Sequence, residues 1–152
     1  MTGPHIDYLA AFRQLPVPIL LLTREFVIAD ANEAYQVATE RSREELVGHN
    51  VFDAFPNNPA DPYATGVQDS IASLSRVLQT GKPDVRSFQK YDVEVPGQPG
   101  LYAPRYWNAV NAPVFGPDGH IVLIAHCLEE ITQRVNRFLE GLRREKGEER
   151  PG

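Results

Sequence analysis

The sequence predicts an α+β domain in which five antiparallel strands form one sheet and helices cover one of its faces. Three observations support this prediction. Segments with the two-residue hydrophobic period of strands occupy two blocks, residues 18–31 and 85–128. Segments with the helical period of about 3.6 residues lie between these blocks, at residues 30–81. The turn sequences PGQPG at 96–100 and GPDG at 116–119 join the later strands directly, which is typical of an antiparallel meander.

A short amphipathic helix is predicted at residues 5–15. One of its faces carries four apolar side chains: Ile6, Leu9, Phe12 and Leu15. Prolines at positions 16 and 18 end it. We expect this helix either to contribute to a dimer interface or to cover the sheet. Residues 18–23 and 26–31 then form the two strands of a hairpin.

Three helix starts in the middle of the chain match the capping-box pattern, in which an N-cap residue is followed three positions later by Glu or Gln. The pairs are Asp30 with Glu33, Ser42 with Glu45, and Thr65 with Gln68. The third pair opens the longest of these helices, whose apolar face carries Val67, Ile71, Leu74 and Leu78 and which ends at Gly81. Residues 55–66, rich in Pro, Asn and Asp, form a loop. Asn32 is expected to be a turn and capping residue rather than a ligand contact.

The later strands are predicted at residues 85–95, 105–115 and 121–128. Alternation in the first of them gives an apolar face with Val85, Ser87, Tyr91, Val93 and Val95, and a polar face with Arg86, Lys90, Asp92 and Glu94. In the second strand Trp107, Ala109, Asn111 and Pro113 share a face, and in the third Val122, Ile124, His126 and Leu128 do so. His126 is the only polar member of its set.

The last strand leads into a helix at Glu129 with no loop residue between the two elements. Glu129 and Glu130 interact favourably with the dipole at the helix N-terminus, by about 0.3–1 kcal/mol. Four apolar residues spaced 4, 3 and 4 positions apart follow: Ile131, Val135, Phe138 and Leu142. This stripe is typical of a coiled-coil seam over two heptads, and it would equally suit a helix that folds back on its own domain. The charged tail 143–152 is expected to be frayed.

Composition excludes several classes of protein. The chain has 15 Lys and Arg against 20 Asp and Glu, a net charge of −5, so it lacks the basic footprint of a nucleic-acid-binding protein. No apolar run is long enough to cross a membrane, and the N-terminus does not resemble a secretory signal. The single cysteine, Cys127, cannot form an internal disulfide, which favours a cytoplasmic location.

Catalytic and metal-binding patterns are weak. His126 and Cys127 are adjacent in a predicted strand, so their side chains point to opposite faces and cannot form a nucleophilic pair. The four histidines, His5, His49, His120 and His126, have no metal-ligand spacing, so we predict no metal site. A small enzyme with a buried acid–base pair stays open as an alternative. Its acid would be Asp92 or Glu94, but both alternate onto the polar face.

Four motifs, in this order, resemble the PAS domain family, a sensory module common in bacterial signalling proteins. They are FVIADANEAY at 26–35, REELVGHNVFDAF at 43–55, RYWNAVNAPVFGPDGHIV at 105–122 and EEIT at 129–132. The resemblance runs from about Leu15 to Thr132 and is closest to the PAS sensors of histidine kinases and related phosphorelay proteins. The family usually has Asp-Ile-Thr at its end. Glu130 replaces that Asp here, so a salt bridge at this position is expected to be looser.

The resemblance implies the strand order 2-1-5-4-3, with helices covering a ligand pocket. It also implies a flanking helix at 1–15, a PAS domain at 16–132 and a linker helix with tail at 133–152. In the family, the helix after the last strand leads to an output domain. We therefore expect a histidine-kinase-type output and a homodimer.

The family's cofactors can be compared with this sequence. Haem-binding relatives place a histidine on the long helix, and residues 66–80 contain none. Flavin-binding photosensors need a cysteine near residues 50–56, which is absent. Both cofactors are disfavoured, haem less firmly because His126 could ligate iron from the sheet. An unidentified small molecule stays possible.

We predict a pocket where the sheet faces the helices. Its candidate lining residues are Phe55, Ile71, Leu74, Tyr91, Trp107, Asn111 and His126. The alternative is a closed core in which the buried Tyr, Asn and His hydrogen-bond one another. The expected function is a non-enzymatic sensor that signals through the 131–142 helix, as part of a longer signalling protein or with separate partners. A ligand-free dimerisation domain is the main alternative.

Overall fold

A central antiparallel sheet organises the computed structural model, which describes residues 3–147. Its strands are β1 (Ile19–Leu22), β2 (Ile28–Ala31), β3 (Asp84–Lys90), β6 (Tyr106–Phe115) and β7 (Ile121–Glu130). The spatial order is β2-β1-β7-β6-β3, which corresponds to the expected 2-1-5-4-3 and confirms that prediction. A separate two-stranded ribbon, β4 (Val93–Glu94) with β5 (Tyr102–Ala103), replaces the end of the strand predicted at 85–95.

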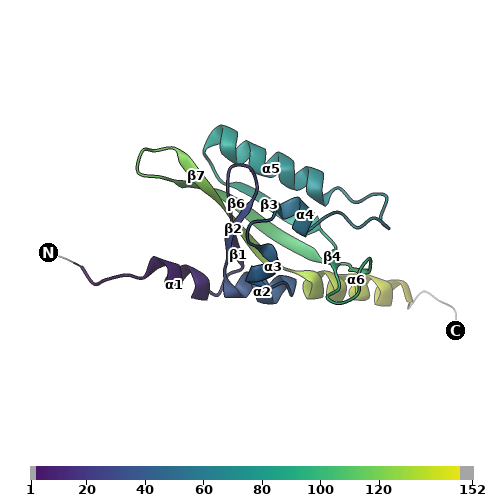
Figure 1. Ribbon diagram of the computed structural model, residues 1–152. Coiled ribbons are helices and arrows are strands. Elements are labelled where there is room, and N and C mark those ends of the chain that lie inside the picture. Colours follow the sequence, from purple (N-terminus) through teal and green to yellow (C-terminus); the bar gives the residue numbers. More distant parts are fainter. Residues whose placement is uncertain (1–2, 148–152) are drawn as a thin grey trace.

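Helices from the middle of the chain cover one face of this sheet (Figure 1). They are α2 (Glu33–Thr39), α3 (Arg43–Leu46), α4 (Val51–Ala54) and α5 (Gly66–Thr80). The core between helices and sheet is centred on side chains that are at most 1% exposed: Leu20, Leu22, Ile28, Leu46, Val77 and Ile124. The α+β class and the segregation of helices to one face are therefore as predicted.

The first capping-box prediction is wrong in its N-cap residue. Asn32, not Asp30, caps α2, and its Oδ1 accepts hydrogen bonds from the backbone N–H of Tyr35 at 3.0 Å and of Ile19 at 2.9 Å. Asp30 instead pairs with Arg43 at 2.7 Å. Asn32 is completely buried, and its Nδ2 donates to the carbonyl of Val17 at 2.7 Å. The capping role predicted for Asn32 is confirmed.

The other two capping predictions have different outcomes. Ser42 caps α3, since its hydroxyl accepts a hydrogen bond from the backbone N–H of Glu45 at 3.2 Å. Thr65 occupies the predicted N-cap position of α5, but its side chain accepts no hydrogen bond from the helix backbone, and its hydroxyl donates to the Asp69 carboxylate at 2.8 Å. The predicted helix start is therefore confirmed, whereas the capping-box hydrogen bond predicted for Thr65 does not form.

Residues on four neighbouring strands align in rows across the sheet. One row, on the helix-covered face, consists of Leu20, His126, Asn111 and Asp84. The next row, on the opposite face, consists of Ile19, Cys127, Val110 and Val85. Successive strand residues point to opposite faces, so His126 and Cys127 are separated by the sheet. The outer row is apolar, and Val85 in it is 69% exposed.

An irregularity in β3 overturns part of the predicted alternation. The pairing of β3 with β6 shifts between Arg86 and Gln89, and Phe88 there has a positive φ of 55°. Because of this bulge, Val85 and Tyr91 do not share a face. Val85 is on the outer face, whereas Arg86, predicted to be on the polar outer side, lies under the helices.

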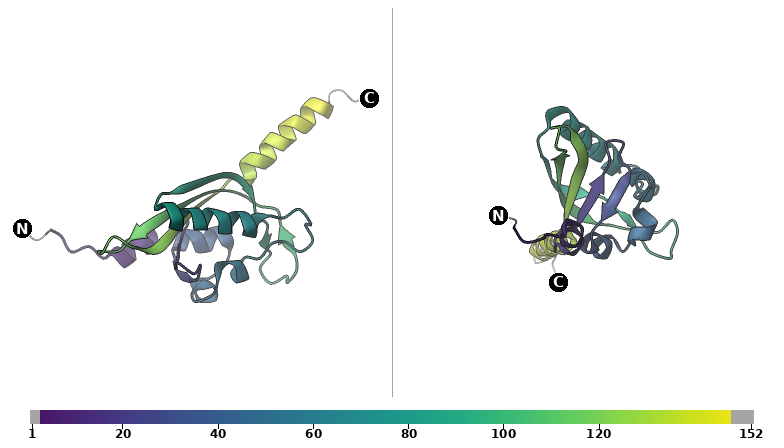
Figure 2. Two further views of the ribbon diagram at one scale, coloured as in Figure 1. Left: turned by 90° about the horizontal axis from the view of Figure 1, so that it is seen from above. Right: turned by 60° about the vertical axis from the view of Figure 1, so that its left-hand side comes forward.

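The terminal helices extend in opposite directions from the sheet (Figure 2). The first, α1 (Tyr8–Gln14), is shorter than predicted, and Leu9 on it is 51% exposed. The last, α6 (Thr132–Gly147), projects away from the domain, so the fold-back alternative is wrong. Residues 143–147, predicted to be frayed, are helical, and the rest of that predicted tail, 148–152, lies outside the described residues.

The helix predicted to begin at Glu129 begins three residues later, because Glu129 and Glu130 pair with β6 as part of β7. The junction between β7 and α6 contains one residue, Ile131, which is only 4% exposed. The Ile131 N–H donates to the carbonyl of Tyr106 at 2.9 Å, and the Thr132 hydroxyl accepts from the Tyr106 N–H at 3.0 Å. Glu130 forms a 2.9 Å ion pair with Arg105. The longer acid therefore keeps an ion pair at this position, and the helix start is tied to β6.

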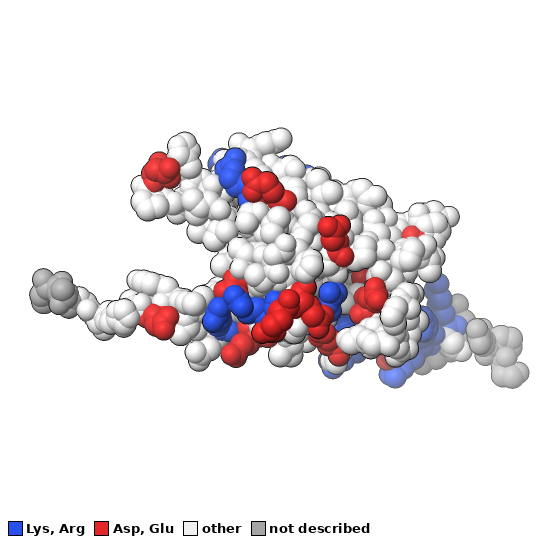
Figure 3. Space-filling view, viewed as in Figure 1, with Lys and Arg blue, Asp and Glu red and all other residues white. Residues whose placement is uncertain are grey.

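Charged side chains of both signs are interleaved over α2 and α3 on the face in Figure 3, whereas basic side chains predominate along α6. Among the described helices, none combines the length and apolar character needed to cross a bilayer.

Candidate functional site

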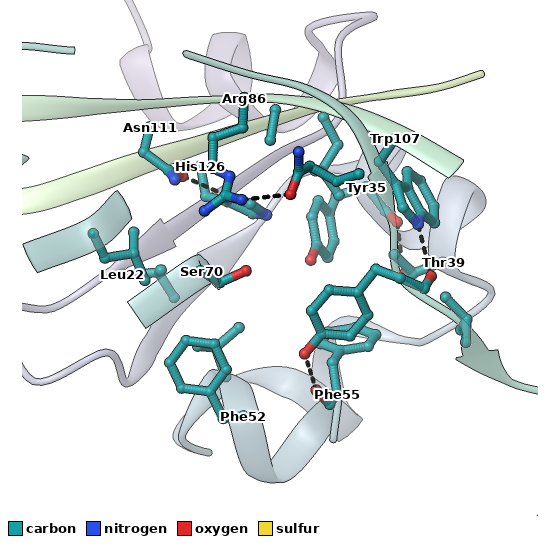
Figure 4. Close-up of a pocket in the computed structure, with 17 residues that line it drawn as sticks. Leu22, Tyr35, Thr39, Phe52, Phe55, Ser70, Arg86, Trp107, Asn111 and His126 are labelled. Carbon is teal, nitrogen blue, oxygen red and sulfur yellow. Dashed lines mark hydrogen bonds between the residues drawn. The ribbon is translucent and has the colours of Figure 1, made fainter. Parts of the chain in front are cut away.

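A cavity lies between the sheet and helices α2, α4 and α5 (Figure 4). Its volume is about 80 Å³. Six of the seven residues predicted from the sequence line it: Phe55, Leu74, Tyr91, Trp107, Asn111 and His126. The folded chain therefore contains an internal space at the predicted place.

Ile71 is the exception among the predicted residues. Its side chain is 39% exposed, and Ser70 on the same helix lines the cavity instead. The buried face of α5 consists of Ser73, Leu74 and Val77, so it includes a polar residue. The sequence analysis identified the buried face of α5 from apolar residues alone. It therefore assigned Ile71 to that face and left out Ser70 and Ser73.

Aromatic side chains form the end of the cavity nearest β4. The Tyr91 hydroxyl donates a hydrogen bond to the carbonyl of Phe55, and Trp107 Nε1 donates to the carbonyl of Tyr91 at 2.9 Å. Gly66, at the start of α5, lies against the Tyr91 ring, and a Cβ there would come within 2.6 Å of it. The absence of a side chain at Gly66 thus allows the loop before α5 to close over Tyr91. Burial of Tyr91 raises the pKa of its hydroxyl.

Tyr35 is a cavity residue that the sequence analysis missed. It lies on α2, is 2% exposed, and its ring meets those of Phe55 and His126 edge-on at centroid distances of 6.2 and 6.3 Å. Burial strongly raises the pKa of its hydroxyl. The helical period could have indicated it, since Tyr35 and Thr39, the buried residues of α2, are four positions apart and share one face.

Arg86 and Gln89 are two further cavity residues that the sequence analysis did not name. Alternation places them on opposite faces, and the bulge between them brings both to the helix-covered side. One guanidinium nitrogen of Arg86 donates to the backbone carbonyl of Asp69, and the other donates to Gln89 Oε1 at 2.5 Å. The Asp69 carboxylate lies 3.8 Å from the guanidinium. The charge of Arg86 therefore has partners inside the protein.

A chain of hydrogen bonds connects the cavity to the surface of the domain. His126 Nδ1 lies 2.5 Å from Asn111 Oδ1, and Asn111 Nδ2 donates to Ser73 Oγ at 2.9 Å. Ser73 Oγ in turn donates to Asp84 Oδ2 at 2.5 Å. The Arg76 guanidinium holds Asp84 through two hydrogen bonds of 3.1 and 3.0 Å. We call this series, from His126 through Asn111 and Ser73 to Asp84, the polar relay.

Two electrostatic shifts accompany the polar relay. Hydrogen bonds from Arg76 and then Ser73 lower the pKa of Asp84, which is therefore ionised at neutral pH. Burial lowers the pKa of His126 from 6.5 to about 4, so its imidazole is neutral. The accessible surface that His126 retains faces the cavity that it lines.

Asp92 lies outside this cavity. It is nonetheless buried, contrary to the exposed position that alternation predicted. It is 8% exposed, and its Oδ2 accepts hydrogen bonds from Asn58 at 3.0 Å and Lys90 at 3.2 Å. Lys90 also contacts Asp61 at 3.0 Å, and this contact is the main cause of the raised pKa of Lys90. Asp92 and Lys90 line a separate polar hollow beside the loop before α5, so Asp92 does not form a pair with His126.

Comparison with known proteins identifies the family. Residues 12–136 match the family described as PAS fold, so the chain belongs to the PAS family. PAS domains are modules of signal sensing and transduction. No curated protein matches the sequence.

Solved structures with the same fold include PAS domains of bacterial regulators. The PAS domain of nitrogen regulation protein NR(II) from Vibrio parahaemolyticus is 16% identical, with a TM-score of 0.62 over 84% of this chain and all (100%) of that one. A sensory box sensor histidine kinase from Vibrio cholerae is 17% identical, with a TM-score of 0.54 over 82% of this chain and 89% of that one. A LuxR-family regulator PAS domain from Burkholderia thailandensis, in complex with ethanol, is 15% identical, with a TM-score of 0.55 over 83% of this chain and 98% of that one. At these identities the similarity is one of fold.

Proposed function

We propose that this PAS domain senses a small ligand in the cavity and transmits the binding event through α6 to a histidine-kinase-type output domain. The observation that carries the proposal is the position of His126. It lies in the wall of the cavity and in β7, the strand that continues into α6 after a single buried residue. A ligand that contacts His126 therefore acts on the strand to which the projecting helix is attached.

The proposed mechanism is a shift between two arrangements of the cavity wall and β7. A ligand changes their populations only by its differential affinity for them, and a tenfold preference corresponds to about 1.4 kcal/mol. Ion pairs and hydrogen bonds at the junction resist independent movement of α6, because Glu130 pairs with Arg105 and Thr132 bonds to Tyr106. Movement of β7 is thus expected to displace the helix.

The output class rests on similarity of fold. Sensor histidine kinases and NR(II) contain PAS domains that superpose on this chain. The projecting α6, with Phe138 67% exposed and Leu142 41% exposed, suits a helix that continues toward another domain or pairs with a second copy.

A ligand-free dimerisation domain is the second candidate. The exposed apolar row on the outer face of the sheet, which includes Val85 and Val110, favours an interaction surface that needs no ligand. The two functions differ in whether the cavity is occupied in the working protein.

Native mass spectrometry of the purified full chain tests the proposal. A Ser70→Phe variant places a ring in the cavity, and Ala72→Phe adds the same ring to the exposed side of α5 as a matched control. We expect a small-molecule adduct with the wild type and the control, and its loss in Ser70→Phe. If neither an adduct nor any stabilisation by a metabolite library is found, the cavity is not a sensing site and the dimerisation function stands.

A further inference from the structure

The polar relay has a fixed direction that its last member sets. An ionised carboxylate only accepts hydrogen bonds, so the Ser73 hydroxyl must donate its proton to Asp84. Ser73 Oγ then serves as the acceptor for Asn111 Nδ2 at 2.9 Å. The Asn111 amide is consequently oriented with its Oδ1 toward His126. The reverse orientation would place two acceptors, Asn111 Oδ1 and Ser73 Oγ, against each other.

This direction determines the tautomer of His126. Asn111 Oδ1 is an acceptor, so the ring nitrogen 2.5 Å from it, Nδ1, carries the proton. In a neutral imidazole the other nitrogen, Nε2, is then an acceptor with a free lone pair. Among the described residues no side chain or backbone group hydrogen-bonds to Nε2, and it is not among the fully buried atoms that lack a partner. Nε2 is therefore open to the cavity that the ring lines.

The other polar groups of the cavity can act in both hydrogen-bonding senses or already have partners in the protein. The hydroxyls of Tyr35 and Ser70 face the same space and can each donate or accept (Figure 4). Arg86 has protein acceptors, the Asp69 carbonyl and Gln89 Oε1. The oxygens Gln89 Oε1 and Asn111 Oδ1 also only accept, but each already has a partner in the protein, whereas His126 Nε2 has none within residues 3–147. Leaving it unpaired against an apolar ligand would add a desolvation penalty.

The volume and the lining of the cavity indicate the size and the apolar character of the ligand. One water needs a cavity of roughly 10–15 Å³, so a volume of about 80 Å³ suits a compact ligand of roughly five to eight non-hydrogen atoms. Apolar and aromatic side chains, among them Leu22, Phe52 and Phe55, surround most of this space. A compact body with a single polar group fits these walls better than a polyol or an extended anion.

We infer that the cavity selects a small neutral compound, about the size of a single ring, that donates an O–H or N–H hydrogen bond to Nε2 of His126. This inference rests on the proposed sensing function and specifies the chemistry of its ligand. The low pKa of His126 supports it, because a protonated ring would present a donor at Nε2 instead. The Asp84–Arg76 pair at the surface thereby determines the hydrogen-bonding sense of the cavity.

The tautomer is measured first, on the full chain. Long-range proton–nitrogen correlation spectra of the ¹⁵N-labelled protein at neutral pH distinguish a protonated Nδ1 from a protonated Nε2, and His126→Gln assigns the signals. We expect protonated Nδ1 in the wild type. In Asp84→Asn, position 84 can also donate, so a fraction of the Nε2–H tautomer is expected to appear. The exposed Asp53→Asn is the matched control and keeps the wild-type tautomer.

If Asp84→Asn does not fold, Ser73→Ala interrupts the polar relay at its centre. A fraction of the Nε2–H tautomer of His126 is expected to appear in this variant as well. Predominant Nε2–H in the wild type would overturn the inference. An unchanged tautomer in both relay variants would also overturn it, because the polar relay would then not set the direction.

Binding is measured next with three neutral probes that fit this size: phenol, toluene and anisole. Phenol offers a donor, toluene offers neither donor nor acceptor, and the oxygen of anisole only accepts. By calorimetry or ligand-observed NMR we expect phenol to bind roughly three- to tenfold more tightly than toluene, as one net hydrogen bond implies. Anisole should bind more weakly than phenol. The preference for phenol should disappear in His126→Leu and persist in the control His49→Leu.

The outcomes separate the inference from the function on which it rests. Toluene or anisole binding as tightly as phenol would overturn the requirement for a donor and leave a ligand-sensing cavity in place. If none of the three probes binds the wild type, both the inference and the proposed sensing function are overturned, because the cavity is then closed to compounds of the size it should hold.

Discussion

At the scale of single residues, His126 combines properties that its neighbours in β7 lack. It is the polar member of an otherwise apolar inner face, it lines the cavity, and it starts the polar relay. Burial disfavours its charged form, so the pKa falls from 6.5 to about 4. The protein consequently holds an uncharged imidazole at neutral pH, and protonation of that ring opposes folding.

Stability is therefore expected to depend on pH between about 4 and 6.5, the folded and unfolded pKa values of His126. In this window the unfolded chain binds more protons, so the free energy of unfolding falls as the pH drops, by up to about 3 kcal/mol in all. Urea unfolding at several pH values from about 7 to 5 measures the slope. Carboxylates with lowered pKa, such as Asp84, contribute only at lower pH.

The matched variants His126→Gln and His49→Gln assign this slope. We expect His126→Gln to flatten it and the exposed His49→Gln to leave it as in the wild type. Equal slopes in the wild type and His126→Gln would show that another group is responsible.

At the scale of elements, the junction between β7 and α6 anchors the start of the terminal helix in the sheet. Ile131 is the single residue between β7 and α6, and its side chain is buried in the domain while α6 itself projects outward. Backbone bonds to Tyr106 and the Arg105–Glu130 ion pair fix the first turn of the helix to β6. The helix direction is thus set by the sheet.

Ile131→Ala is expected to destabilise the domain by about 2–4 kcal/mol, because it removes a buried side chain and leaves a cavity at the junction. Leu139→Ala, on the projecting part of α6 where the side chain is 37% exposed, should change stability by less than about 1 kcal/mol. Denaturant unfolding measures both. Equal effects of the two substitutions would mean that the junction is not anchored in the core.

At the scale of the whole molecule, the described residues include two exposed apolar surfaces that suit contact with a second copy. One is the outer face of the sheet, where Val85 and Val110 lie side by side, and the other is the stripe along α6. The stripe begins at buried Ile131 and continues to Phe138 and Leu142, which are well exposed. A single copy does not bury it, which favours pairing of α6 with α6 of a second copy.

Phe138→Glu is expected to weaken self-association of the full chain at least tenfold, since it places a charge in the centre of the proposed helix seam. Its fold should persist, because Phe138 is 67% exposed. Arg137→Glu adds negative charge beside the stripe and serves as control. Sedimentation velocity over a concentration series measures the effect, and unchanged association in Phe138→Glu would exclude α6 as the interface.

The fold was largely predictable, whereas the cavity wall was predictable only in part. Period and turn sequences located the strands and the main helices, since these signals depend on neighbours in the chain. Arg86 was assigned to the wrong face because the bulge in β3 arises from pairing with β6. Ser73 was overlooked because a small polar residue on a helix looks exposed until its buried partners, Asn111 and Asp84, are known.

The sequence by itself determined the α+β class, the family resemblance, the capping role of Asn32 and the near-direct continuation of the last strand into a helix, but not the residue at which that helix begins. Only the tertiary structure decided which side chains meet in the cavity, that Ile71 faces outward, and that His126, Asn111, Ser73 and Asp84 form one connected series. The reason is physical: hydrophobic period and turn chemistry act between residues close in the chain, whereas strand register and buried hydrogen bonds join residues far apart in it.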